Sequence, residues 1–260
     1  MSEKTKFEQE VRDNVDAIGK DDELRRDTLQ WMIRAGGDYR YSYNFSWMGR
    51  PIIQYPQDIV GMQELIWRVR PDLIVEMGIA HGGSLICNAS MLALLEYSEA
   101  VEAGTVLDPA KPQRKVLGVD IDIRQHNRAA IEAHPMAGRI EMIEGSSVDA
   151  GTIAQVREFA ASYNNVMVVL DSNHTHKHVL AELEAYAHLT AVGSYCVVFD
   201  TVVEDVPDEY STDRPWGKGD NPKTAVWEYL KSHPEFEIDK DIENKLLITV
   251  APDGFLRRVS

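Results

Sequence analysis

Acidic and hydroxyl side chains stand at the ends of five short apolar runs in this sequence. The runs are DLIVEM, VLGVD, IEMIEG, VMVVLD and SYCVVFD, and the polar segments that follow them cover residues 76–84, 120–122, 145–147, 171–174 and 199–201. In an open parallel sheet, ligands bind at the carboxyl ends of the strands. Loops are generally polar, which would explain polar residues at the end of one strand. Acids at the ends of successive strands instead predict a binding site.

The first polar segment is a glycine-rich loop that starts with an acid. Gly78 permits an abrupt turn, and Gly82 and Gly83 let the backbone pass close to a ligand before a helix begins near Ser84. The carboxylate of Glu76 would repel a pyrophosphate but attract an ammonium group. The lysine of the nucleotide-binding P-loop signature is missing from this loop. The loop therefore favours a ligand that carries positive charge.

Asp120 closes the second apolar run and matches the acid that binds two ribose hydroxyls in dinucleotide-binding sheets. A glycine loop, an acid for an ammonium group and an acid for a ribose together favour S-adenosylmethionine over NAD. An NAD-linked oxidoreductase on the same sheet remains the alternative, and a cofactor titration would separate the two.

Histidines follow Asp171 closely, at positions 174, 176 and 178. A histidine at a strand end beside a carboxylate can accept the proton of a substrate hydroxyl. His174 is the candidate base, because it is nearest to the strand end, and a hydrogen-bonded structural histidine is the alternative. For His176 and His178 the structural interpretation is favoured. His81, in the glycine loop, fits a pocket wall or an exposed position equally well.

Apolar runs that alternate with helical periods predict an α/β fold with a parallel sheet covered on both faces. Helices are expected near residues 83–96, 124–133, 149–162, 176–189 and 222–232. Near the C-terminus, KLLITVAP and FLRRV flank a Pro252-Asp253-Gly254 turn, which predicts an antiparallel hairpin at one edge. The expected fold is an open, mostly parallel sheet with an antiparallel C-terminal hairpin.

The N-terminal part is expected to be an extension of this domain. Apolar spacings of three and four predict two helices within residues 1–35. Aromatic residues alternate over residues 39–47, but Gly49, Pro51 and Pro56 favour an extended lead-in over a strand. Asp58 is expected to cap the next helix. We divide the chain into a helical and aromatic extension, residues 1–57, and a Rossmann-like domain, residues 58–260.

Composition excludes several classes of protein. Lys and Arg number 27 against 42 Asp and Glu, and the net charge of −15 disfavours a nucleic-acid partner. Cys87 and Cys196 both lie in apolar stretches, which predicts free buried thiols. The N-terminus has no apolar core of signal-peptide length, and no run reaches the about 20 apolar residues of a membrane span. We therefore expect a cytoplasmic protein with no membrane partner.

The motifs PIIQYPQD, EMGIAHGGS, VLGVDID, LDSNHTHKHVLAELE, VGSYCVVFD and RPWGKGDNPKTAVWEYL occur in this order. Over most of residues 39–258 the chain thereby resembles the cephalosporin hydroxylase family. Although the family is named for a hydroxylase, the resemblance implies the class I S-adenosylmethionine-dependent methyltransferase fold with a seven-stranded sheet. It also implies kinship with metal-dependent O-methyltransferases that act on sugars of antibiotics. It does not identify the acceptor.

The resemblance assigns roles to the residues that match. Those expected to contact the methyl donor are Glu76, Gly78, Gly82, Gly83, Ser84, Asp120, Ser146, Ser147 and Asp171, with the two serines on the adenine side. Asp171 and Asp200 match the metal acids, and two carboxylates with substrate oxygens suit Mg²⁺. Phe199 stands where the family commonly has an acid, which puts the metal site in doubt. Asn173, Thr201 and Glu204 are the residues that would compensate.

We therefore expect an enzyme that transfers a methyl group from S-adenosylmethionine to a hydroxyl of a small acceptor, a sugar or a natural product. A cation on Asp171 and Asp200 would lower the pKa of the acceptor, and His174 would be the base, so Asp171 and His174 are the catalytic candidates. The alternative is a non-catalytic donor-binding subunit that assists an oxygenase, as the family name suggests.

Two further segments are expected to cover the acceptor pocket and to form a subunit interface. Residues 213–222 are rich in glycine and are expected to cover the acceptor pocket, where Trp216 would either stack on a sugar or anchor the loop. The tendency of the family to assemble implies a homo-oligomer. The N-terminal helices and the aromatic stretch are the candidates for its interface.

Overall fold

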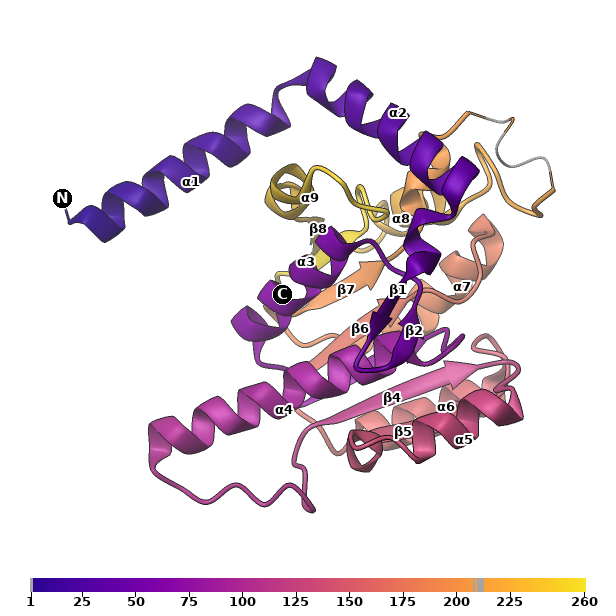
Figure 1. The fold of residues 1–260 in the computed structure, drawn as a ribbon. Helices are drawn as coiled ribbons and strands as arrows, with labels where there is room; N and C mark the ends of the chain where they lie inside the picture. Colours follow the sequence, from indigo (N-terminus) through magenta and orange to yellow (C-terminus); the bar gives the residue numbers. More distant parts are fainter. Residues whose placement is uncertain (1, 208, 210–212) are drawn as a thin grey trace.

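A computed structural model describes residues 2–207, 209 and 213–260, and its centre is a seven-stranded sheet (Figure 1). The strand order is β5-β4-β3-β6-β7-β9-β8, with β9 antiparallel to both of its neighbours and the other pairs parallel. The strands are β3 (Leu73–Met77), β4 (Lys115–Asp120), β5 (Ile140–Glu144), β6 (Val166–Leu170), β7 (Tyr195–Val198), β8 (Phe236–Ile238) and β9 (Phe255–Arg258). The predicted mostly parallel α/β sheet is confirmed.

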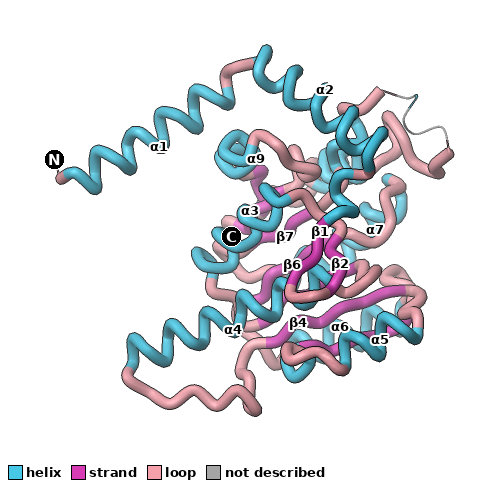
Figure 2. Tube along the Cα trace, viewed as in Figure 1, coloured by secondary structure: helices cyan, strands magenta, loops and turns pink. Residues whose placement is uncertain are grey.

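Helices cover both faces of this sheet, and each face has its own apolar core (Figure 2). One core joins the sheet to α3 (Pro56–Val69) and α4 (Gly83–Ala103); the other joins it to α6 (Ala150–Ala160), α7 (His176–Tyr186) and α8 (Pro222–Tyr229). Because β3 and β6 are buried on both faces, their sequences are continuous apolar runs. Successive side chains alternate between the two cores, so Glu76 projects with Ile74 toward α4.

The antiparallel C-terminal pair consists of β8 and β9, with Phe236 opposite Arg258. The run KLLITVAP, which the sequence assigned to the hairpin, is instead the end of α9 (Lys240–Leu246) followed by an irregular segment. That segment is held by the buried carboxylate of Asp58, which accepts hydrogen bonds from the Thr249 hydroxyl and from the Val250 amide, at 3.1 Å. A contact distant in sequence therefore holds this run, whose larger apolar residues are half-buried, and it forms no strand.

Residues 39–52 contain a small hairpin where the sequence predicted an extended lead-in. A 3-10 turn (Tyr41–Asn44) precedes β1 (Phe45–Trp47), which pairs with β2 (Arg50–Ile52). The two loop residues, Met48 and Gly49, have φ of 45° and 86°, the positive values of the turn that fits the twist of a two-residue hairpin. The hairpin packs on α4, where the Trp47 indole donates to the Ser90 hydroxyl at 2.9 Å.

Helix α3 begins three residues earlier than predicted, because Pro56 occupies its first turn and Tyr55 is its N-cap. Asp58 is therefore inside the first turn and does not cap the helix. The other predicted helices are confirmed: α4, α5 (Gln125–Glu132), α6, α7 and α8, with α4 extending to Ala103. Asn221 caps α8 with its side chain, and Pro222 follows it.

Two helices, α1 (Glu3–Gly19) and α2 (Asp22–Tyr39), precede the hairpin, as the apolar spacing predicted. Helix α2 buries Met32 and Ile33, whereas α1 buries no residue and projects past α9 (Figure 1). Within the described ranges, no helix is both long and apolar enough to cross a membrane. The division of the chain at residue 57 stays a prediction.

Candidate active site

A cavity of about 320 Å³ opens at the carboxyl ends of β3, β6 and β7. The hairpin and the segment before α3 form one wall, and the loop after β3 forms another. Of the predicted site residues, this cavity brings together Gly78, Gly83, Ser84, Asp171, His174 and Asp200. Glu76 lines a smaller adjoining pocket with Asp171, and Asp120, Ser146 and Ser147 line neither.

The glycine loop turns as abruptly as predicted, with φ of 100° at Gly78 and 81° at Gly82. A Cβ at Gly78 would overlap the backbone carbonyl oxygen of Asp171, and one at Gly83 would overlap that of Pro51. Two glycines are thus required by close approach of backbone to backbone. The loop is thereby held against β6 on one side and the hairpin on the other.

Glu76 fixes the start of α4. Its side chain is buried, and its carboxylate accepts hydrogen bonds from the Ser84 hydroxyl and from the Asn88 amide, at 2.8 Å. Burial raises the pKa of Glu76 from 4.5 to about 7, and the two hydrogen bonds oppose this rise. Its predicted contact with an ammonium group stays a prediction.

Asp120 holds the glycine loop from the neighbouring strand. One carboxylate oxygen accepts hydrogen bonds from the amides of Ile79 and Ala80, at 2.8 and 3.2 Å. The other oxygen accepts one hydrogen bond from the Asp122 amide, at 3.1 Å. Since a carboxylate oxygen has capacity for more than one donor, this second oxygen retains room for a ribose hydroxyl.

Ser147 belongs to a buried polar cluster on the opposite face of the sheet. Its hydroxyl donates to one carboxylate oxygen of Glu182 in α7, at 2.5 Å, and the Ser172 hydroxyl donates to the same oxygen at 2.5 Å. His178 lies 3.3 Å from that oxygen. Glu182 thereby ties together the segments that follow β5 and β6. Ser146 is half-buried beside this cluster, and the adenine contact of the two serines stays a prediction.

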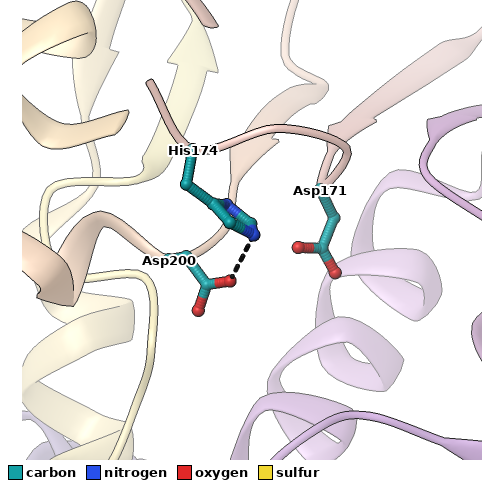
Figure 3. Close-up of side chains that lie close together, drawn as sticks. All are labelled: Asp171, His174 and Asp200. Atoms are coloured by element: carbon teal, nitrogen blue, oxygen red, sulfur yellow. Dashed lines mark ion pairs between the residues drawn. The ribbon is translucent and has the colours of Figure 1, made fainter. Parts of the chain in front are cut away.

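Asp171, His174 and Asp200 converge at the ends of β6 and β7 (Figure 3). One ligand atom from each of the three lies within 4.8 Å of the others, and Nε2 of His174 is 3.2 Å from Oδ2 of Asp200. Withdrawal from solvent, followed by the negative charges of Asp200 and Glu76, raises the pKa of Asp171 well above its usual value. A cation at this place would relieve that repulsion.

Gln54, from the segment before α3, was not identified from the sequence. Its side-chain amide donates to Oδ2 of Asp171 at 3.2 Å, and it lines the cavity. Its carbonyl oxygen Oε1 is buried and has no hydrogen-bond partner among the residues that the structure describes. The only available signal was its place in the PIIQYPQD motif, because the contact spans 117 residues.

Phe199 contributes no ligand, because its side chain is buried in the core under α4. The three residues expected to compensate have other partners. Oδ1 of Asn173 accepts from Thr175, the Thr201 hydroxyl donates to the Pro252 carbonyl at 2.6 Å, and Glu204 accepts from Gly219 and Asn221. His174 is the residue that completes the cluster, a role for which the sequence provided no spacing rule.

The segment after β7 contacts a cavity residue through Trp216, whose ring packs edge-on against the His174 ring at a centroid distance of 4.8 Å. The Arg214 guanidinium lies 5.6 Å above the Trp216 ring. His176 has a structural contact, since its Nδ1 lies 2.8 Å from the Thr224 hydroxyl of α8. His178 belongs to the Glu182 cluster, which also agrees with the structural interpretation.

Comparisons with known proteins agree on one family. The family model described as Rhamnosyl O-methyltransferase/CmcI matches residues 39–259. A rhamnosyl O-methyltransferase of Mycobacterium tuberculosis (strain ATCC 25618 / H37Rv) is 29% identical over 218 residues, which is 82% of this chain and 78% of the relative. The corresponding protein of Mycobacterium leprae (strain TN) is 29% identical over 215 residues, 82% of each chain.

Solved structures with the same fold include two of CmcI. A CmcI apo-structure has a TM-score of 0.57 and 22% identity, covering 84% of this chain and 77% of that one. A CmcI structure described as Mg-SAM has a TM-score of 0.55 and 20% identity, covering 84% and 78%. At these identities, the likeness establishes the fold.

Proposed function

This chain belongs to the rhamnosyl O-methyltransferase/CmcI family, and from that premise we propose that it is an enzyme that methylates a hydroxyl oxygen of a small acceptor. The methyl donor is S-adenosylmethionine. The observation that carries the proposal is the cavity at the ends of β3, β6 and β7, where the glycine loop meets Asp171, His174 and Asp200. A donor site and a group of acids are thus open to the same space.

The acceptor is a sugar hydroxyl, either on a free glycosyl group or on a glycosylated natural product. The support is the name of the mycobacterial relatives, rhamnosyl O-methyltransferase, which match 82% of this chain. Tyr43, Tyr55 and His81 line the cavity and provide the aromatic and polar surface on which a sugar ring binds.

Donor binding is assigned to the loop from Gly78 to Ser84, with Asp120 for the ribose and Ser146 and Ser147 for the adenine side. The packing of Gly78 against the Asp171 carbonyl and of Gly82 against the Ile131 side chain fixes the shape of the loop, and Gly78, Gly83 and Ser84 line the cavity. Glu76 and Asp171 are assigned to the charged end of the donor, since negative groups attract its ammonium and sulfonium. When bound, the donor supplies an electrophilic methyl group.

A divalent cation is assigned to Asp171 and Asp200, and it would lower the pKa of the acceptor hydroxyl. The donor set fits, since the two carboxylates lie in one cluster and, among the contacts described above, neither of them pairs with a lysine or an arginine. The sequence prediction made the ion Mg²⁺ and His174 the base. Nε2 of His174 is also placed to bind the ion, and a nitrogen that does so is not free to accept a proton.

The contribution of the protein to the reaction is then alignment and exclusion of water. Methyl transfer is an in-line displacement, so the acceptor oxygen must lie close to the methyl carbon and opposite the leaving sulfur. The hairpin, the loop after β3 and the acids after β6 and β7 form three walls that fix two ligands relative to each other. Trp216 adds a cover on the His174 side.

The test is calorimetry with S-adenosylmethionine and with NAD, followed by a methyl-transfer assay on a panel of rhamnosides and other glycosides. We expect heat with S-adenosylmethionine and not with NAD, and incorporation of methyl into at least one acceptor. Heat with NAD alone would establish the oxidoreductase instead.

Phe199 favours one other function, a donor-binding subunit that assists an oxygenase without catalysing transfer. Phe199 stands at the cation site where the family commonly has an acid, and its side chain is buried. Donor binding with no methyl transfer to any acceptor, with and without added divalent cations, would establish this second function.

The protein is assigned to the cytoplasm and to a homo-oligomer. Cys87 and Cys196 are buried free thiols, as expected in a reducing compartment. The apolar face of α1, which buries no residue, is the candidate subunit contact.

A further inference from the structure

We propose that Asp171, His174 and Asp200 form a mixed carboxylate–imidazole site that binds a first-row transition ion, such as Mn²⁺ or Co²⁺, in preference to Mg²⁺. The inference deepens the proposed function, on which it rests only for the role of the ion in the reaction. It replaces the all-oxygen magnesium site predicted from the sequence, and it makes His174 a ligand instead of a base.

The three ligand atoms come from two neighbouring strand ends. Asp171 and His174 follow β6 within four positions, and Asp200 follows β7. The ligand atoms lie within 4.8 Å of one another, so small side-chain rotations bring them to one ion. All three residues line the cavity, which leaves the remaining coordination positions for water or for acceptor oxygens.

Gln54 is a second, independent sign that a polar ligand belongs at this place. Its side chain is only 7% exposed, and its amide nitrogen is committed to Asp171. Its carbonyl oxygen is buried and has no partner in the described part of the chain, although buried polar atoms are almost always hydrogen-bonded. A water molecule bound to an ion at Asp171 would donate to this oxygen and satisfy it.

The donor set determines which ion is preferred. Mg²⁺ takes oxygen ligands in octahedral geometry, whereas an imidazole nitrogen suits transition ions. The position before Asp200, where a third carboxylate would serve Mg²⁺, is the buried Phe199. Asn173, Thr201 and Glu204 are hydrogen-bonded elsewhere. The nitrogen of His174 is therefore the third protein ligand.

Trp216 orients this ligand. Its ring packs edge-on against the imidazole with 4.8 Å between ring centroids, which restricts the rotation of His174. The same contact provides a reporter, because a paramagnetic ion on His174 would quench the fluorescence of a tryptophan this close.

The decisive experiment is pulsed electron paramagnetic resonance on the full chain, stripped of metal and loaded with Mn²⁺, with no donor or acceptor present. We expect nitrogen-14 modulation from a directly bound imidazole, lost in His174→Ala and kept in the control His176→Ala. Absence of nitrogen coupling in the unaltered protein, or its persistence in His174→Ala, would overturn the proposal. The first of these readouts needs no variant, so a folding defect cannot obscure it.

Titration calorimetry with Mg²⁺ and Co²⁺ measures the preference itself. In His174→Asp the ligands are all oxygens, so the ratio of the Mg²⁺ to the Co²⁺ dissociation constant should fall by about tenfold or more. A ratio unchanged within about twofold would contradict the inference. Neither measurement involves methyl transfer, so both results can be interpreted even if the protein proves not to be a methyltransferase. If either measurement contradicts the metal site, the proposed donor binding is still tested separately.

Discussion

Glu76 combines a buried carboxylate with neutral hydrogen-bond donors, and this determines how its charge affects stability. Its pKa is raised from 4.5 to about 7 by burial, so the folded state favours the protonated form. The contribution to stability is fully present below pH 4.5 and is lost as the pH rises through 7. The acid that closes β3 is therefore a stabilising group only at low pH.

We predict that Glu76→Gln reduces the pH dependence of unfolding. The wild-type free energy of unfolding should fall between pH 5 and pH 8 by about 2–3 kcal/mol more than that of the variant, because glutamine cannot ionise. Urea unfolding at the two pH values measures this. Asp58 also has its pKa raised to about 7, but it is present in both proteins, so its own contribution cancels in the difference. The exposed acid Glu158, changed to glutamine, should produce no such difference.

Gly78 and Gly104 both have positive φ, but their surroundings differ. A Cβ at Gly78 would overlap the carbonyl oxygen of Asp171, whereas at Gly104 no atom lies within 4 Å. Gly104→Ala should lower the free energy of unfolding by about 1 kcal/mol and leave donor binding unchanged. Gly78→Ala should lose more stability and weaken S-adenosylmethionine binding at least about tenfold, since the loop must move. Equal donor affinities in the two variants would show that the approach to Asp171 is unimportant.

At the level of helices and strands, the elements that could be predicted from the sequence were those whose residues are all in the same kind of environment. Strands β3 and β6 were predictable because both faces are buried, which leaves an apolar run and a polar residue at the end. The β1–β2 hairpin was missed because Met48, a residue that rarely adopts positive φ, occupies its turn. The run before Pro252 was misassigned because it is held by Asp58, about 190 residues away, and not by a neighbouring strand.

The same reasoning explains the limits of prediction at the site. Acids at strand ends were identified correctly as neighbours, because parallel strands bring their carboxyl ends to one edge. The contact of Gln54 with Asp171 and the convergence of His174 on Asp200 depend on loop conformations. Asp200 itself has a φ of 56°, and such a conformation cannot be read from residue type.

Glu182 joins three elements, and we predict that its shape matters more than its charge. One carboxylate oxygen accepts from Ser147 and Ser172, while the other is buried without a partner. Glu182→Gln keeps one acceptor oxygen and should change the free energy of unfolding by less than about 1 kcal/mol. Glu182→Ala removes the acceptor of the buried Ser147 hydroxyl and leaves a cavity, and it should lower the free energy of unfolding by about 2–4 kcal/mol in urea unfolding. A Gln variant as unstable as the Ala variant would mean that the charge is required.

Helix α1 packs against α9 but leaves much of its surface exposed. Its 17 residues include none that is buried, although Phe7, Val11, Val15 and Ile18 recur at helical spacing. Val11 and Val15 line a groove together with residues of α3 and α9, whereas the Phe7 residue is 66% exposed. An isolated helix of this length is marginal in water. A second copy of the chain is the partner that the proposed homo-oligomer would supply.

We therefore predict that Phe7→Glu dissociates the oligomer without unfolding the subunit. The ring is largely exposed in the single chain, so its loss should leave the melting temperature of the dissociated subunit unchanged, while a charge in a buried subunit contact is unfavourable. Light scattering coupled to size-exclusion chromatography should give a multiple of 29.3 kDa for the wild type and a smaller mass for the variant. Glu10→Gln, on the same exposed helix, is the control and should keep the wild-type mass. A wild-type mass of one chain, or a Phe7→Glu mass equal to the wild-type multiple, would remove α1 from the interface.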